Sequence, residues 1–277
     1  MTRQETVLVA SDLDRTLIYS SAALGLTVPD PQAPRLLCVE VHEGRPLSFM
    51  TETAAALLAA LAADPSAVFV PTTTRTRKQY QRIRFPGPPA RYAICANGGQ
   101  LLVDGVPDRD WRRAVAGRLA AECAPLEEVH QHLLAVSDPV WLRKTRLAED
   151  LFAYLVVERA LVPDEWLKAL TEWAGARGWT VSLQGRKIYA VPRPLTKSAA
   201  MREVVRRTGA ATTLAAGDSL LDADLLLAAD RAWRPGHGEL ADAGWTAPTV
   251  TALSAAGVVA GEEIVREFVR AVGTPAA

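Results

Sequence analysis

Short apolar runs recur along the chain, and each ends in polar or small residues. They lie at 7–10, 68–70, 92–95 and 214–216. Each run is the length of a strand, and none alternates cleanly between apolar and polar positions. This pattern predicts strands that are covered on both faces.

Helical patterns separate these runs. A helix is predicted over 54–63, where leucines form one stripe, and others over 196–207, which Gly209 ends, and 222–229. Strands that alternate with helices predict an α/β fold with a mainly parallel, Rossmann-like sheet. In such sheets the functional residues lie at the carboxyl ends of the strands.

The middle of the chain follows another order, in which two helices precede two strands, a helix and two strands. The last two strands, 180–183 and 187–191, flank a predicted hairpin turn at Gln184-Gly185-Arg186. We therefore expect an inserted α+β cap domain of order αββαββ over 108–186. The catalytic core is expected to combine 1–107 with 187–277.

Length and composition narrow the function classes. The 277 residues are 49% hydrophobic, which is enough for two domains, and 31 basic residues balance 31 acidic ones. Zero net charge argues against general binding to nucleic acid or an anionic membrane. Three cysteines match no zinc or disulfide pattern, and no run approaches the roughly 20 apolar residues of a membrane helix. We expect a cytoplasmic protein, of an oligomeric state that its composition does not indicate.

Two carboxylates, Asp12 and Asp14, directly follow the first apolar run. A pair of aspartates can form a turn or cap a helix. Like charges that are buried close together are costly unless a cation or a shared proton offsets them. The pair therefore indicates a hard metal ion, a nucleophile with its acid/base partner, or both.

Three more polar groups follow strands or begin a helix. They are the run Thr72-Thr73-Thr74, Lys197 and the segment from Gly217 through Asp218 to Asp222. Together with the first pair they offer carboxylates for a divalent cation, hydroxyl and N–H donors for an anion, and a fixed positive charge. This set favours phosphoryl transfer, with Mg²⁺ as the cation, because Mg²⁺ needs few carboxylates beside a phosphate oxygen. Thr73 is favoured over its neighbours as the hydroxyl donor.

In this order the motifs DxDxT, Thr, Lys and GDxxxD resemble the haloacid dehalogenase superfamily of aspartate-nucleophile phosphatases. The insertion is similar to its subclass IIB cap, found in sucrose-phosphate, mannosyl-phosphoglycerate and Cof-type sugar phosphatases. The resemblance implies that Asp12 is the nucleophile, that Asp14 is the general acid/base and that Thr73, Thr74 and Lys197 bind phosphate. It also implies a Mg²⁺ site formed by Asp12, Asp14 (through its backbone carbonyl as well), Asp218 and, directly or through water, Asp222.

Three positions depart from that family pattern. Arg15 stands where Gly or Asn is common, Thr74 where Gly is common, and Leu221 where Asn is expected. In the predicted cap, a basic group indicates a polyhydroxylated or doubly anionic substrate, although a solvated sheet face would explain each member alone. The group consists of Arg143, Lys144, Arg146, Arg186 and Lys187.

These features predict a Mg²⁺-dependent phosphoric monoester hydrolase. Its expected partner is a small phosphate ester, most simply a sugar phosphate, and neither nucleic acid nor membrane. Two alternatives remain open. A phosphomutase would pass the phosphoryl group to another sugar, and a catalytically silent module would bind the ligand without turnover.

Overall fold

The computed structural model describes residues 5–273. The chain divides into two compact units: a core unit of Met1–Pro107 with Lys197–Ala277, and an inserted unit of Asp108–Thr196. The inserted unit extends beyond the end expected at residue 186. The reason is that the strand after that residue pairs inside the inserted sheet and not in the core sheet.

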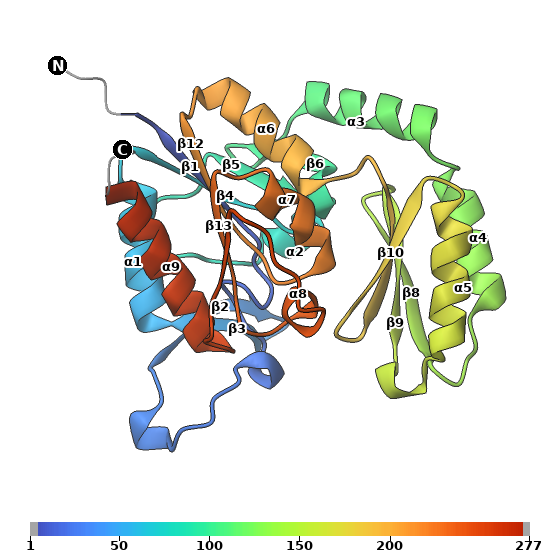
Figure 1. Ribbon diagram of the computed structural model, residues 1–277, viewed down its shortest axis with the longest axis horizontal. Helices are drawn as coiled ribbons and strands as arrows, with labels where there is room; N and C mark the ends of the chain where they lie inside the picture. The colour runs from blue at the N-terminus through green and yellow to red at the C-terminus, as the bar shows by residue number, and fades with distance from the viewer. Residues whose placement is uncertain (1–4, 274–277) are drawn as a thin grey trace. The chain divides into compact units, whose positions relative to one another are not determined.

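The core unit is built on a five-stranded parallel sheet (Figure 1). In spatial order its strands are β14 (Val250–Ala252), β13 (Arg231–Arg234), β12 (Thr212–Ala216), β1 (Val7–Ser11) and β4 (Ala67–Pro71). Ser11 at the end of β1 is level with Ala216 of β12 and Pro71 of β4. The residues that follow these three strands are therefore brought to one edge of the sheet.

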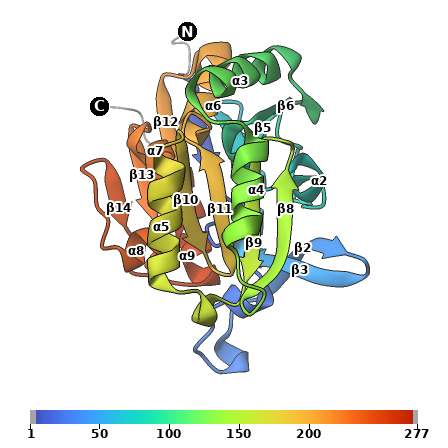
Figure 2. The same ribbon diagram turned by 90° about the vertical axis from the view of Figure 1, so that its right-hand side faces the viewer.

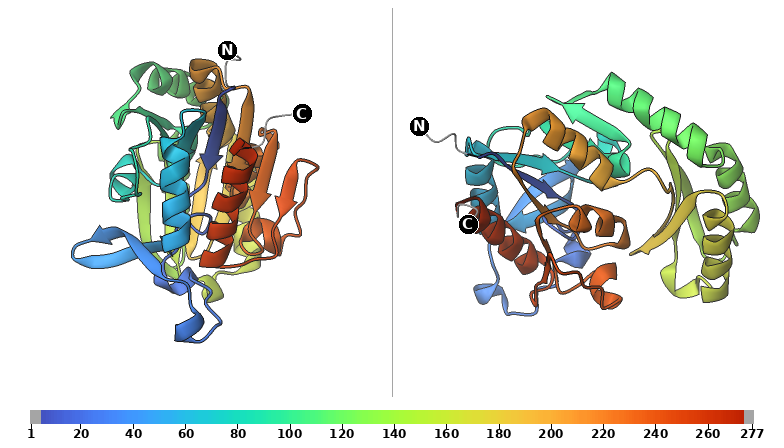
Figure 3. Two further views of the ribbon diagram at one scale, coloured as in Figure 1. Left: turned by 90° about the vertical axis from the view of Figure 1, so that its left-hand side faces the viewer. Right: turned by 45° about the horizontal axis from the view of Figure 1, so that its top comes forward.

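Helices cover both faces of this sheet. The core helices are α1 (Glu52–Ala63), α2 (Arg77–Tyr80), α6 (Lys197–Thr208), α7 (Ala223–Leu227), α8 (Glu239–Asp242) and α9 (Val258–Gly273). On one face α1 and α9 lie side by side (Figure 3), and α6 and α7 lie on the other (Figure 1). The buried core under α1 and α9 includes Val9, Leu58, Phe69 and Phe268.

Two antiparallel elements complete the core unit. One is a hairpin of β2 (Leu36–His42) and β3 (Arg45–Thr51), and the other is a small sheet of β5 (Tyr92–Cys95), β6 (Gln100–Val103) and β7 (Val106–Pro107). Glu43 and Gly44 both adopt positive φ in the hairpin turn, as a tight two-residue turn requires. The apolar pattern does not predict the β2–β3 hairpin.

The inserted unit is an antiparallel sheet with two helices on one face (Figure 2). Its elements are α3 (Arg109–Glu122), α4 (Leu126–Val136), β8 (Leu142–Ala148), β9 (Phe152–Val157), α5 (Asp164–Gly175), β10 (Trp179–Gln184) and β11 (Lys187–Pro192). The strand order is β10-β11-β9-β8, and α4 and α5 pack on β9 and β10. The predicted α/β core with an inserted α+β domain is confirmed.

Within residues 5–273, the structure contains no helix with the length and apolar character that crossing a membrane would require.

Candidate active site

Asp12 lies at the edge of the core sheet where β1 ends. Its backbone N–H donates to Ala216 O of β12 (2.9 Å), which extends the parallel ladder by one residue. Its side chain is almost fully buried, and Thr16 donates its hydroxyl to Oδ2 of Asp12 (3.1 Å). Strand register and a local turn therefore fix the position of the Asp12 carboxylate through contacts within the protein.

Lys197 joins Asp12 to Asp222. Its fully buried ammonium donates to Asp12 Oδ1 (2.5 Å) and to Asp222 Oδ1. Burial acts to lower the pKa of Lys197, but Asp12 and Asp222 outweigh burial and raise it. Lys197 is also the first residue of α6, a position that the helix dipole disfavours for a cation. The carboxylates of Asp12 and Asp222 offset both the burial of the Lys197 ammonium and its unfavourable position in the helix dipole.

Oxygens of Asp12, Asp218 and Asp222 lie within 4.8 Å of one another, and all three residues are buried. Burial, with Asp222 adding to it and Lys197 opposing it, raises the pKa of Asp12 to about 7. The pKa of Asp218 is raised too, by burial and by Asp12 and Asp222. One ammonium does not balance three carboxylates, so this all-oxygen group fits a hard divalent cation such as Mg²⁺.

Asp222 has a second task in the loop after β12. Its Oδ2 accepts from the backbone N–H groups of Asp218 (3.2 Å) and Ser219 (2.9 Å) and from the Ser219 hydroxyl (2.7 Å). A Cβ on Gly217 would lie 2.3 Å from Asp222 Cβ, so only glycine fits there. Since both of its oxygens are engaged, Asp222 is placed to orient Lys197 and Asp218.

Asp14 is not in that carboxylate group. Its half-exposed side chain accepts two bonds from Arg75, at 2.7 Å from Nε to Oδ2 and 2.7 Å from Nη2 to Oδ1. This is a bidentate pair, the strongest geometry for arginine and a carboxylate. The two aspartates of the first motif therefore have different environments.

Arg75 also binds the β2–β3 hairpin. Its Nη1 donates to Glu40 Oε2 (2.8 Å) and its Nη2 to the Ser48 hydroxyl (3.2 Å). Glu40 is buried and also lies 2.9 Å from Arg82 Nε. The sequence motifs did not indicate Glu40 as part of the site. An acidic residue within an otherwise apolar strand was the available signal.

The three threonines of the loop after β4, Thr72 to Thr74, differ in burial and in hydrogen bonding. Thr72 donates its hydroxyl to Val70 O (3.0 Å), whereas Thr73 Oγ1 accepts from Arg75 N (3.1 Å), which leaves its O–H for another acceptor. Thr73 O accepts from the Asn97 N–H (3.0 Å), so the turn that follows β5 supports this loop. Thr74 is only partly buried. That Thr73 donates a hydrogen bond to phosphate stays a prediction. It is favoured because the Thr73 hydroxyl donates to no acceptor among the described residues.

In the inserted unit, the register aligns three of the predicted basic residues. Lys144 and Lys187 both pair with Val156, and Arg146 pairs with Tyr154, so the three point to one face of the sheet. Arg186 lies in the hairpin turn instead. Arg143 lies at a bulge, 3.8 Å from Glu158.

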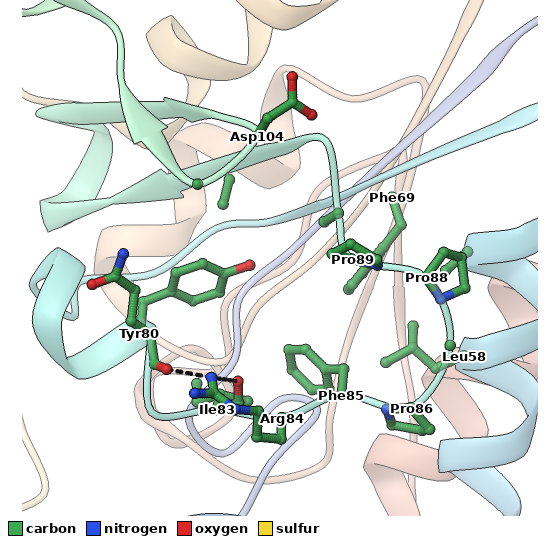
Figure 4. Close-up of a pocket in the computed structure, with 16 residues that line it drawn as sticks. Leu58, Phe69, Tyr80, Ile83, Arg84, Phe85, Pro86, Pro88, Pro89 and Asp104 are labelled. Carbon is green, nitrogen blue, oxygen red and sulfur yellow. Dashed lines mark hydrogen bonds between the residues drawn. The ribbon is translucent and has the colours of Figure 1, made fainter.

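A separate cavity of about 680 Å³ lies in the core unit beneath the proline-rich loop after α2 (Figure 4). Leu58, Phe69, Tyr80 and Phe85 line it. None of its lining residues is a predicted site residue, so the cavity is distinct from the carboxylate group.

Comparison with solved structures identifies the architecture. Sucrose-phosphatase from Synechocystis, solved with sucrose and phosphate, superposes with a TM-score of 0.62 at 14% identity, covering 98% of this chain and 99% of that one. The trehalose-6-phosphate phosphatase C-terminal domain of C. albicans has a TM-score of 0.59 at 14% identity, covering 96% and 93%. The chain has the haloacid dehalogenase fold.

A haloacid dehalogenase subclass IIB sugar phosphatase is also similar, with a TM-score of 0.56, 14% identity and coverage of 97% and 99%. No protein-family model and no curated protein sequence matches the chain. The similarity to the haloacid dehalogenase fold, which the motifs predict, is thus confirmed over the lengths of both units. The roles of individual residues stay predictions.

Proposed function

We propose that the protein is a Mg²⁺-dependent phosphatase that hydrolyses a small phosphate monoester through an aspartyl-phosphate on Asp12. The observation that carries this proposal is the buried Asp12–Lys197–Asp222 contact beside Asp218, at the strand edge that Thr73 shares. A nucleophile, an anion-binding cation and oxygen ligands for a metal are the groups that phosphoryl transfer needs.

Asp12 is suited to attack phosphorus because Lys197 favours its ionised form against the effect of burial. In the first step an Oδ of Asp12 forms a bond to phosphorus, the bond from phosphorus to the leaving oxygen breaks, and Asp14 gives that oxygen a proton. In the second step water attacks the aspartyl-phosphate, Asp14 takes the proton back, and Asp12 is regenerated with release of phosphate.

Arg75 favours the ionised form of the Asp14 carboxylate between these steps. A carboxylate that accepts two guanidinium bonds is ready to take a proton from water. To protonate a leaving group, Asp14 must hold a proton and give up at least one of these bonds. The Arg75–Asp14 pair thus suits the second step as it stands.

Asp12 and Asp218 would hold the Mg²⁺, with the Asp14 carbonyl as the resemblance implies and with Asp222 in support. When bound, the cation offsets the repulsion between Asp12 and the phosphate dianion. The residues fit this role because three buried carboxylates face a single ammonium, that of Lys197, which does not neutralise them.

A sugar phosphate is the substrate class we propose. The inserted sheet presents Tyr154 and Tyr189, with ring centroids 5.4 Å apart, on the same face as Lys144, Arg146 and Lys187. Aromatic rings beside flexible polar groups suit a polyhydroxylated ligand. The sucrose- and trehalose-phosphate enzymes among the structural neighbours favour the same class.

A panel of sugar phosphates, other phosphate esters and p-nitrophenyl phosphate tests the proposal. We expect phosphate release that requires Mg²⁺ and is lost in Asp12→Asn, whereas the exposed-site control Asp30→Asn retains it. Measuring isomerised sugar phosphate beside free phosphate separates a mutase from a hydrolase. Full activity in Asp12→Asn, or binding without turnover across the panel, would refute the proposal.

A further inference from the structure

Arg15 adopts a backbone conformation that an L-residue rarely takes. Its φ is +64°, at the position where Gly or Asn is common in the family motif. Its N–H donates to Ile18 O (2.8 Å), and its carbonyl accepts from His237 Nε2 (2.8 Å). The backbone N–H of Gly257 donates to His237 Nδ1 (3.1 Å), so Nε2 carries the hydrogen. The fold therefore holds an arginine where glycine would be less strained.

The guanidinium of Arg15 lies at the solvent edge of the carboxylate group. Its Nε is 3.3 Å from Asp218 Oδ2, and its side chain is 46% exposed against 8% for Asp218. The contact is an ion pair, and among the described residues this guanidinium makes no hydrogen bond. Its terminal N–H groups are therefore available to a ligand that enters from solvent.

The charges around the site make the Arg15–Asp218 ion pair dependent on whether a cation is bound. When ionised, Asp12, Asp218 and Asp222 outnumber Lys197 by two negative charges, and Arg15 offsets one of them. A divalent cation at Asp12 and Asp218 would neutralise both. Arg15 would then have no net negative charge left to balance, so its guanidinium would favour an incoming anion.

We propose that Arg15 is an anion-binding residue linked to the cation site: it pairs with Asp218 in the cation-free protein and binds the phosphate oxygens of the ligand once Asp218 is used by Mg²⁺. This inference rests on the Mg²⁺ site of the proposed function. It assigns Arg15 two alternative partners, Asp218 and the phosphoryl group. Arginine suits the second because its planar fork matches phosphate oxygens.

Isothermal titration calorimetry with MgCl₂ alone tests the first half. In Arg15→Gln the cation no longer competes with a guanidinium, so we expect Mg²⁺ to bind about fivefold more tightly than to the unchanged protein. Arg35→Gln is the matched control, because Arg35 is an exposed core-unit arginine paired with Glu52. That control should leave Mg²⁺ affinity unchanged.

Titration of inorganic phosphate at saturating Mg²⁺ tests the second half. We expect affinity about fivefold weaker in Arg15→Gln and unchanged in Arg35→Gln. Arg15→Lys keeps the charge but not the fork, so it should bind Mg²⁺ as the unchanged protein does and bind phosphate less tightly. This second variant preserves the test if the glutamine variant does not fold.

The outcomes separate the two ideas. If the unchanged protein binds Mg²⁺ and Arg15→Gln does not bind it more tightly, the Arg15 inference is overturned and the proposed function stands. Phosphate affinity that is the same with and without the Arg15 side chain overturns it equally. If the unchanged protein binds no Mg²⁺, both are overturned.

Discussion

Lys197 is a buried cation that can be stable only beside its carboxylates. Taking an ammonium out of water costs several kcal/mol, and Asp12 and Asp222 offset that cost through direct bonds. The same contacts place a positive charge against Asp12, the proposed nucleophile. Removing Lys197 should therefore affect both stability and the proposed catalysis.

We expect Lys197→Met to lower kcat about 100- to 1000-fold, because charge developing on the phosphoryl group loses its nearest fixed cation. The free energy of unfolding should fall by about 3 kcal/mol, since buried carboxylates lose their partner. Steady-state kinetics and urea unfolding measure the two effects. Lys78→Met, at an exposed site in α2, is the control, and equal kcat in both variants would contradict the assigned role.

Arg75 positions Asp14, and its effect should depend on the leaving group. Arg75→Met is expected to slow hydrolysis of an alkyl phosphate about 10- to 100-fold, because Asp14 loses the remaining Arg75 bond that orients it while it protonates a poor leaving group. Hydrolysis of 2,4-dinitrophenyl phosphate, whose leaving group needs none, should change less.

Arg82→Met is the matched control for Arg75, since Arg82 contacts the same buried Glu40 but not Asp14. It should reduce stability without the leaving-group dependence. A purely structural role for Arg75 would slow both substrates equally and would leave the pH profile of kcat unmoved.

At the scale of elements, the strands and helices that carry the site were predictable because each is signalled locally. Apolar runs mark β1, β4, β5 and β12, and their register brings Asp12 and Asp218 together. The β2–β3 hairpin was not predictable, since its mixed exposure resembles a loop. Glu40 and Arg75 became partners only through tertiary packing, 35 residues apart in the chain.

The loop after β12 depends on Gly217. We expect Gly217→Ala to destabilise the protein by about 1–3 kcal/mol, because the new methyl group would collide with Asp222. Activity should fall with it as Lys197 and Asp218 lose their orientation. Thermal unfolding and kinetics measure both.

The comparison for that variant is Gly117→Ala in helix α3, where nothing lies within 4 Å of the added Cβ. That change should be neutral or stabilising, since alanine favours helix more than glycine does. If Gly217→Ala behaved in the same way, the close packing against Asp222 would be wrong.

At the scale of the whole molecule, the carboxylate group links stability to pH. Burial raises the pKa of Asp12 from 3.8 to about 7, so folding favours its protonated form. The free energy of unfolding without Mg²⁺ should therefore decrease as the pH rises from about 4 to about 7. Mg²⁺ should stabilise the protein more at pH 8 than at pH 5.

Thermal unfolding across this pH range, with EDTA and with Mg²⁺, measures the effect. Asp12→Asn should weaken the dependence in EDTA, because the amide does not titrate while Asp218, whose pKa is also raised, still does, whereas Asp30→Asn should leave it intact. A cation-free protein that gains stability over this range would contradict the raised pKa of Asp12.

The inserted unit leaves and rejoins the core at Pro107–Asp108 and Thr196–Lys197. No carboxylate of the candidate site lies between these junctions, so the segment is a cassette that could be exchanged for that of a structural neighbour while the residues of the proposed phosphoryl transfer are kept. The second junction sets the design constraint. The first core residue after it is Lys197 itself, so a graft that alters the start of α6 would change the proposed catalytic centre along with the proposed substrate choice.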